Sequence, residues 1–105
     1  MKFDIKKFLE DQKSWSEIQF GKGRRTIGIC NHIRHELIEI ENDPDNLEEW
    51  IDVLLLAFDA IWRLGVSPKD VVETLLKKQH KNINREWGSI PPETKPSFHL
   101  KEKEN

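Results

Sequence analysis

Residues 36–52 read ELIEIENDPDNLEEWID, and this stretch predicts two helices joined by one short turn. Residues 42–46 place a proline among Asn and Asp residues, which end one helix and begin the next. On each side of the turn lie two acids at i,i+3 spacing, so each pair shares one helix face. The pairs are Glu36 with Glu39, and Glu49 with Asp52. If the two helices pack antiparallel, we expect both pairs to converge on one small volume.

Carboxylates that lie so close together need a counter-charge. They repel one another unless they are protonated or neutralised by a cation. Oxygen ligands suit hard divalent ions, so Mg²⁺ is the expected ion, with Mn²⁺ as a substitute. The opposite interpretation is a solvated acidic stripe that holds no metal, with local ion pairs such as Asp59 with Arg63 at i,i+4. The two facing acidic pairs favour the metal site.

The composition restricts the class of protein. The chain has 105 residues, 34% of them charged and 36% hydrophobic, as expected for one small domain with a modest core. We therefore expect the chain to form oligomers. A formal net charge of −2 gives no support for nucleic-acid binding. The single cysteine, Cys30, fits a reducing cytoplasmic compartment, and charges within the apolar stretch 47–64 argue against a membrane span.

Apolar spacing and capping signals predict an all-α protein, a bundle of four helices. We expect these helices over about residues 3–18, 27–41, 46–64 and 68–86. Asp45 with Glu48 forms a capping-box pattern for the third helix, which Gly65 ends. Ser67 followed by Pro68 is a strong start for the fourth helix.

The C-terminal end of the chain differs in composition from the rest. Residues 1–88 carry all four expected helices and form the predicted domain. Residues 89–105 contain three prolines and end in alternating Lys and Glu, which is typical of a loose tail. No alternating apolar pattern along the chain is long enough to predict a sheet.

The third expected helix is apolar around nearly its whole circumference. Helices of this kind are buried on most sides, which indicates an enclosed position in the bundle, a subunit interface, or both. One charged seam remains, and a buried carboxylate on it needs a partner because burial of an uncompensated charge is costly. The seam consists of Glu49, Asp52, Asp59 and Arg63.

A second group of polar side chains lies on the fourth expected helix. Lys78, Asn82 and Arg85 recur at i, i+4 and i+7, and Trp87 lies nearby. Two cations and an amide on one face suit the oxygens of a polyphosphate, and arginine can bind two oxygens at once. The alternative is that cations near a helix C-terminus only complement the helix dipole. Together with an acidic metal site, these residues favour a site for a metal-bound nucleotide.

Several segments resemble a known enzyme family. The two acidic pairs are similar to the signature of the all-α nucleoside triphosphate pyrophosphatases, the MazG-like group. More narrowly, four segments in order are similar to the short phage and bacterial dATP/dGTP diphosphohydrolases, the MazZ-like branch. These segments are FGKGRRTIG (20–28), HIRHELIEI (32–40), LEEWIDV (47–53) and KQHKNINREW (78–87). One departure is His35, because the broad family pattern has a second glutamate beside Glu36.

The resemblance implies hydrolysis of a (deoxy)nucleoside triphosphate, with a preference for dATP and dGTP, to its monophosphate and pyrophosphate. It implies that the four acids hold Mg²⁺, that metal-activated water attacks the α-phosphorus, and that one carboxylate such as Glu39 accepts a proton. Lys78 and Arg85, helped by Arg25, are then expected to bind the outgoing pyrophosphate. The expected roles of the remaining residues are contact with sugar or phosphate for Asn82, and stacking on the base for Trp15, Phe20 and Trp87.

Other classes of protein fit the sequence less well. The enzyme is expected to assemble as a homodimer or homotetramer. A scaffolding helical module would share the apolar third helix but carry its acids in solvent. A ferritin-like di-iron protein needs Glu-x-x-His pairs on two helices, and this chain has none. A helix-turn-helix over residues 67–87 is disfavoured by its acidic residues and by the negative net charge. Uptake of Mg²⁺ or Mn²⁺ distinguishes the enzyme from the scaffold.

Overall fold

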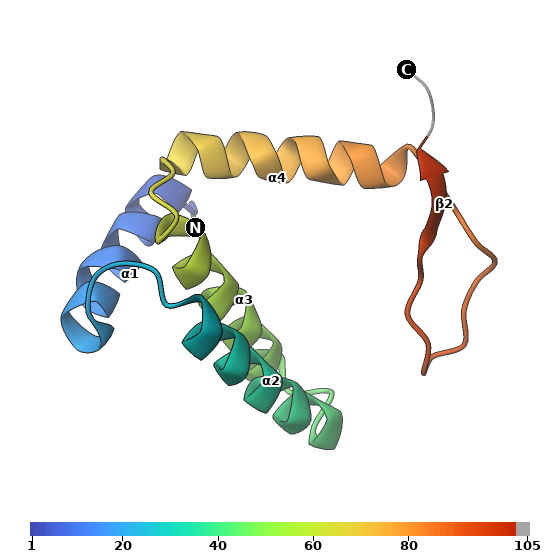
Figure 1. The fold of residues 1–105 in the computed structure, drawn as a ribbon, viewed down its shortest axis with the longest axis horizontal. Coiled ribbons are helices and arrows are strands. Elements are labelled where there is room, and N and C mark those ends of the chain that lie inside the picture. Colours follow the sequence, from blue (N-terminus) through green and yellow to red (C-terminus); the bar gives the residue numbers. More distant parts are fainter. Residues whose placement is uncertain (103–105) are drawn as a thin grey trace. The chain divides into compact units, whose positions relative to one another are not determined.

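The computed structural model describes residues 1–102, and the side chains of residues 1–100. Four α-helices are followed by two short strands (Figure 1). The elements are α1 (Ile5–Phe20), α2 (Thr26–Asn42), α3 (Leu47–Trp62), α4 (Pro68–Ile83), β1 (Arg85–Trp87) and β2 (His99–Glu102). The prediction of an all-α protein with four helices is confirmed, and the first three helices begin and end within a few residues of the expected positions.

Polar side chains cap three of the four helices. The Asp4 carboxylate accepts a hydrogen bond from the Lys7 amide at 3.2 Å and begins α1. At α4, Ser67 Oγ accepts from the Asp70 amide at 3.1 Å, and Asp70 Oδ2 accepts in return from the Ser67 amide at 3.3 Å. This reciprocal pair is the capping box at the predicted start of the fourth helix.

The cap of α3 differs from the prediction by one residue. The Asn46 side chain accepts from the Glu48 amide at 3.0 Å, so Asn46 and not Asp45 is the N-cap. Asn and Asp are nearly equivalent in this position, and the sequence pattern alone does not separate adjacent Asx residues.

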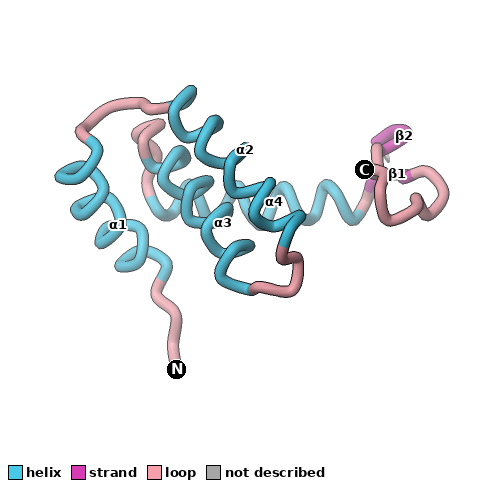
Figure 2. Tube along the Cα trace, turned by 90° about the horizontal axis from the view of Figure 1, so that it is seen from below, coloured by secondary structure: helices cyan, strands magenta, loops and turns pink. Residues whose placement is uncertain are grey.

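The chain divides into two compact units, Met1–Val71 and Val72–Asn105. In the first unit, α2 and α3 lie side by side as an antiparallel hairpin, and α1 packs against α3 (Figure 2). The core of this unit lies where α1 meets the C-terminal half of α3, together with the first turn of α4. Its buried apolar residues are Leu9, Phe58, Trp62 and Val71.

The N-terminal half of α3 is not enclosed by the chain itself. Trp50 is 53% exposed and Leu54 is 48% exposed, although both lie on the most apolar helix. Exposed apolar side chains on α2, Leu37 and Ile38, add to this surface. The expectation that α3 is buried on most sides is therefore wrong for a single chain, because α1 and α2 cover only part of its circumference.

The second unit ends in a small antiparallel sheet. Strand β1 pairs with β2 in the register Glu86 opposite Lys101 and Trp87 opposite His99. The predictions of a helix to residue 86 and of no sheet are wrong here. Asn84 Nδ2 donates to the His80 carbonyl at 2.8 Å and Trp87 Nε1 donates to the Asn82 carbonyl at 2.8 Å, so side chains satisfy the last helical carbonyls.

Strands this short carry too few residues to produce a recognisable alternation. Residues 88–98, which join the strands, contain neither helix nor strand. Residues 103–105 of the predicted tail lie outside the described part of the chain. Within residues 1–102, no helix is both long and apolar enough to cross a lipid bilayer.

Candidate functional site

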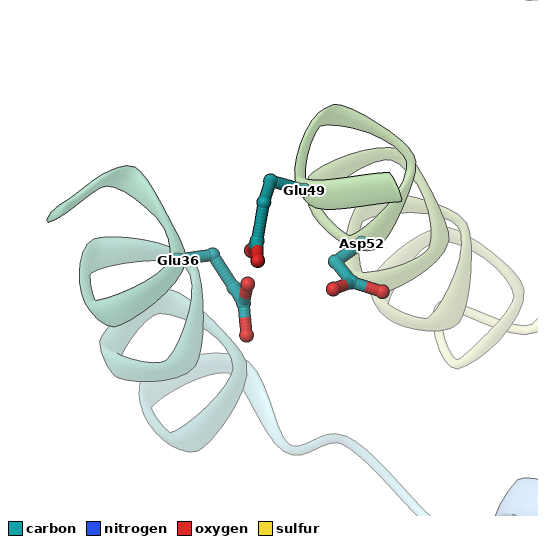
Figure 3. A group of neighbouring side chains, drawn as sticks. All are labelled: Glu36, Glu49 and Asp52. Carbon is teal, nitrogen blue, oxygen red and sulfur yellow. The ribbon is translucent and has the colours of Figure 1, made fainter. Parts of the chain in front are cut away.

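An acidic cluster lies between α2 and α3. Glu36, Glu49 and Asp52 each offer one carboxylate oxygen, and these oxygens lie within 4.8 Å of one another. Figure 3 shows Glu36 projecting from one helix and Glu49 and Asp52 from the other, with all three carboxylates directed into the space between them. The antiparallel hairpin thus brings together three of the four acids that the spacing predicted to converge.

The fourth acid, Glu39, lies beside the cluster and is not one of these three residues. It is half-buried one turn after Glu36 on α2, and its carboxyl group forms a hydrogen bond with that of Glu49. Glu39 Oε1 also lies 3.3 Å from His35 Nε2. Glu39 is therefore linked to the cluster through Glu49.

The electrostatics of the cluster centre on Glu49. The pKa of its carboxyl group is raised from 4.5 to about 7, first by the hydrogen bond with Glu39, then by burial and by the negative charge of Glu39. Glu36 raises the pKa further through a hydrogen bond and its charge. The neighbouring carboxylates therefore hold a proton on Glu49 close to neutral pH, because this proton relieves their mutual repulsion.

Two carboxylate oxygens of the cluster are buried without a partner. When all the carboxyl groups are ionised, Glu36 Oε2 and Glu49 Oε2 accept no hydrogen bond from any described residue. A buried acceptor without a donor is costly, and carboxylates must either bind protons or meet a cation. Their oxygens and their spacing fit a divalent cation such as Mg²⁺, which takes carboxylate ligands.

Two histidines contact the acids of α2 from its exposed side. His32 Nε2 lies 3.4 Å from Glu36 Oε1, in the same i,i+4 relation as His35 and Glu39. Each imidazole thus approaches one oxygen of a carboxylate. In Glu36 this leaves Oε2 as the atom without a hydrogen bond among the described residues.

A cavity of about 560 Å³ adjoins the acidic cluster. Glu36 and Asp52 form part of its wall, and most of the remaining wall is apolar. The aromatic part includes Trp15 and Phe20, whose rings meet edge to face at 5.6 Å. The guanidinium of Arg25 lies over the Phe20 ring at 5.1 Å from its centre. Phe20 and Arg25, both predicted to bind substrate, therefore lie in the same cavity as two of the acids.

The other predicted substrate-binding residues lie in the second unit. Lys78, Asn82 and Trp87 line a hollow of about 510 Å³ there. Arg85 Nη1 donates to Asn82 Oδ1 at 3.1 Å. The three residues that the spacing placed on one face thus lie close together with Trp87, although β1 rather than a continued helix carries Arg85 and Trp87.

Sequence reasoning missed part of the cavity wall and misjudged one ion pair. Gln12 lines the cavity, donates to the Leu55 carbonyl at 2.9 Å and accepts from Trp62 Nε1 at 3.1 Å. The Asp59–Arg63 pair, which the alternative interpretation placed in solvent, is buried where α1 packs on α3. Two opposite charges four residues apart on an otherwise apolar helix were the available signal for this burial.

Comparisons with known proteins identify the family of the chain. Residues 8–105 match the sequence model of the dATP/dGTP pyrophosphohydrolase family. The chain is also 33% identical over 60 residues to the Eaa protein of Salmonella phage P22, a match that spans 57% of this chain and 19% of that protein. No solved structure is significantly similar to the chain. Because the family match covers nearly all of it, this chain belongs to the dATP/dGTP pyrophosphohydrolase family.

Proposed function

We propose that this protein hydrolyses nucleoside triphosphates, dATP and dGTP foremost, to the monophosphate and pyrophosphate with Mg²⁺ as cofactor. The observation that carries this proposal is the acidic cluster at the wall of a largely apolar cavity. Three carboxylates lie within 4.8 Å, and two of their buried oxygens have no donor among the described residues. The family description names the two nucleotides.

Glu36, Glu49 and Asp52 are the proposed metal ligands, with Glu39 as a fourth acid beside them. A divalent ion held there would neutralise charge on the phosphates and lower the pKa of the attacking water, and Mn²⁺ suits the same ligands. Glu39 already shares a hydrogen bond with Glu49, so it is the proposed acceptor of a proton from the water. His32 lies 3.4 Å from Glu36 and His35 lies 3.3 Å from Glu39.

The cavity beside the acids is the proposed binding place for the nucleotide. Aromatic side chains stack on nucleobases irrespective of sequence, and Trp15 and Phe20 supply such rings here. Arg25 brings a positive charge to the same wall and is the proposed contact to the phosphates. For Lys78, Arg85, Asn82 and Trp87 we propose contacts to pyrophosphate, sugar and base, on the evidence of their shared hollow.

Assembly into a homodimer or homotetramer is part of the proposal. Trp50, Ile51 and Leu54 on α3 expose 40–53% of their surface, which is unusual for the most apolar helix of a small domain. A second copy would remove this surface from water. Light scattering should give a mass of two or four chains, and Leu54→Lys should lower it. We propose that the oligomer works in the cytoplasm, where Cys30 stays reduced, and that it binds neither nucleic acid nor membranes.

The experiment that tests this function measures monophosphate and pyrophosphate released from each dNTP and NTP, with Mg²⁺ and with EDTA. Release from dATP and dGTP that stops with EDTA is the expected result. Glu36→Gln should abolish turnover, whereas Glu41→Gln, at an exposed acid of the same helix, should leave it unchanged. If calorimetry finds no uptake of Mg²⁺ or Mn²⁺ with or without nucleotide, the scaffold interpretation replaces this one.

A further inference from the structure

The guanidinium of Arg63 lies buried between α1, α3 and the loop that joins α1 to α2. Its side chain is 1% exposed, and Nε donates to Asp59 Oδ1 at 2.5 Å. Nη2 donates to Ser16 Oγ at 2.9 Å, and Ser16 Oγ in turn donates to Asp59 Oδ2 at 2.5 Å. Every residue of this network is thus paired, as a buried charge requires.

The remaining nitrogen of Arg63 binds the loop backbone. Nη1 donates to the carbonyls of Gly21 and Gly23, at 2.8 Å in both cases. Both glycines have positive φ angles, 88° and 89°, in the region that residues with a side chain rarely adopt. Arg63 therefore holds a loop conformation that the two glycines make possible.

The loop that Arg63 holds carries two residues of the nucleotide cavity. Phe20 directly precedes Gly21, and Arg25 follows Gly23 by two residues. Both line the cavity, where the Arg25 guanidinium lies on the Phe20 ring. A displacement of residues 21–23 would move these two side chains relative to the acids of α2 and α3.

We propose that Arg63 is a positioning residue for nucleotide binding: by fastening residues 21–23 it places Phe20 and Arg25 at the cavity wall. The inference rests on the proposed function. Lysine keeps the positive charge beside Asp59, but its single ammonium cannot replace a planar fork that binds two carbonyls, a hydroxyl and a carboxylate together. The geometry of Arg63, and not its charge alone, is therefore what the loop requires.

Steady-state kinetics of Arg63→Lys with dATP and Mg²⁺ test this role. Displacement of the loop weakens contacts that bind the substrate equally in the ground state and in the transition state. KM should therefore rise on the order of tenfold, whereas kcat should change by less than about threefold. Mn²⁺ affinity without nucleotide, measured by calorimetry, should stay at the wild-type value. Arg24→Lys, an exposed arginine of the same loop, is the matched control and should change neither constant.

A double-mutant cycle separates positioning from general destabilisation. If Arg63 acts through the cavity wall, Arg63→Lys should raise KM much less in an Arg25→Ala background than in the wild type. Full additivity of the two changes would overturn the inference. So would an unchanged KM in folded Arg63→Lys, or a loss of Mn²⁺ affinity together with kcat.

A second variant covers the case in which Arg63→Lys does not fold. Gly23→Ala strains the loop because residue 23 has a positive φ, while the added Cβ meets no atom within 4 Å and the side chains of Ser16, Asp59 and Arg63 are unchanged. It should raise KM in the same way, and a wild-type KM would overturn the inference. A wild-type protein that hydrolyses no nucleotide refutes the proposed function itself and this inference with it, whereas an active wild type with unaffected variants refutes the inference alone.

Discussion

Two acidic regions on α3 have opposite environments. Near its N-terminal end, Glu49 and Asp52 join Glu36 in a cluster where two buried oxygens have no donor among the described residues. Near its C-terminal end, Asp59 has Ser16 and Arg63 on its two oxygens. Burial of an acid therefore does not by itself indicate a ligand site. The distinction lies in whether the protein itself supplies their partners.

The difference has a physical cause. A buried ion pair whose hydrogen bonds are complete needs nothing further, and removal of one partner leaves a strongly destabilising charge. A group of carboxylates without donors is unfavourable until a proton or a cation arrives, and the raised pKa of Glu49 reflects this. We therefore propose that the Asp59–Arg63 network stabilises the fold and that the Glu36–Glu49–Asp52 cluster binds the metal. Four predictions test this contrast.

The largest effect is expected from Asp59→Ala. This change leaves Arg63, 1% exposed, without its carboxylate partner, which should lower the free energy of unfolding by about 3–5 kcal/mol. Urea unfolding followed by circular dichroism measures this loss. The folded fraction should retain wild-type Mn²⁺ affinity, and a loss of metal binding without a loss of stability would reverse the assignment of the two regions.

Glu49→Gln should have the opposite effects: a loss of activity without a loss of stability. It removes a proposed metal ligand, so kcat for dATP should fall at least about a hundredfold, since metal contributes several kcal/mol to such reactions. It also removes a negative charge from a repelling group, so the melting temperature of the metal-free protein at pH 8 should not decrease. Turnover assays and thermal unfolding measure the two effects. A clear drop in melting temperature with intact activity would show that this acid is structural.

The pH dependence distinguishes the regions without a mutation. The folded-state pKa of Glu49 is about 7 against an ordinary 4.5, so its stabilising contribution is complete below pH 4.5 and is lost as the pH rises through 7. Because Mg²⁺ must displace this proton, its affinity should be roughly tenfold lower at pH 6 than at pH 8. Calorimetry at both pH values measures this ratio and the released proton. An affinity independent of pH would contradict the raised pKa.

The smallest effect is expected from the exposed ion pairs. His35 and Glu39 form an i,i+4 pair at 3.3 Å, and Lys7 and Asp11 form a comparable pair at 2.7 Å on α1. His35→Ala should change the free energy of unfolding by less than about 0.5 kcal/mol, and Lys7→Ala should leave the midpoint of denaturation unchanged. Chemical denaturation of both variants makes the comparison. A much larger change for His35→Ala alone would show that this histidine belongs to the acidic region.

Part of the site could be predicted because it depends on local spacing. The i,i+3 pairs and the Asx-Pro turn predicted that acids would meet across a helical hairpin, and three of the four do. Glu39 was placed in the same set because it shares the helix face of Glu36. Its carboxyl group lies beside that of Glu49, so Glu39 adjoins the three acids without belonging to the group within 4.8 Å.

The end of α4 shows why other features could not be predicted. Residues 84–87 continue a helical spacing of polar residues, and the sequence therefore predicted helix to residue 86. Hydrogen bonds from Asn84 and Trp87 to the last carbonyls, and pairing with residues 99–102, end the helix at Ile83. Pairing across a dozen intervening residues is not visible in a local pattern.

The helices, their turn and the approach of acids across it can be predicted from the amino-acid sequence, because hydrogen bonds and side-chain periodicity within a helix involve near neighbours only. Which acids of α3 have hydrogen-bond partners depends on tertiary packing. The partners of Asp59 include Ser16 from α1, and Arg63 also binds carbonyls of Gly21 and Gly23, more than thirty residues away. No such donor reaches Glu36 Oε2 or Glu49 Oε2 from the described chain, and this supports the proposal that these carboxylates bind a cation.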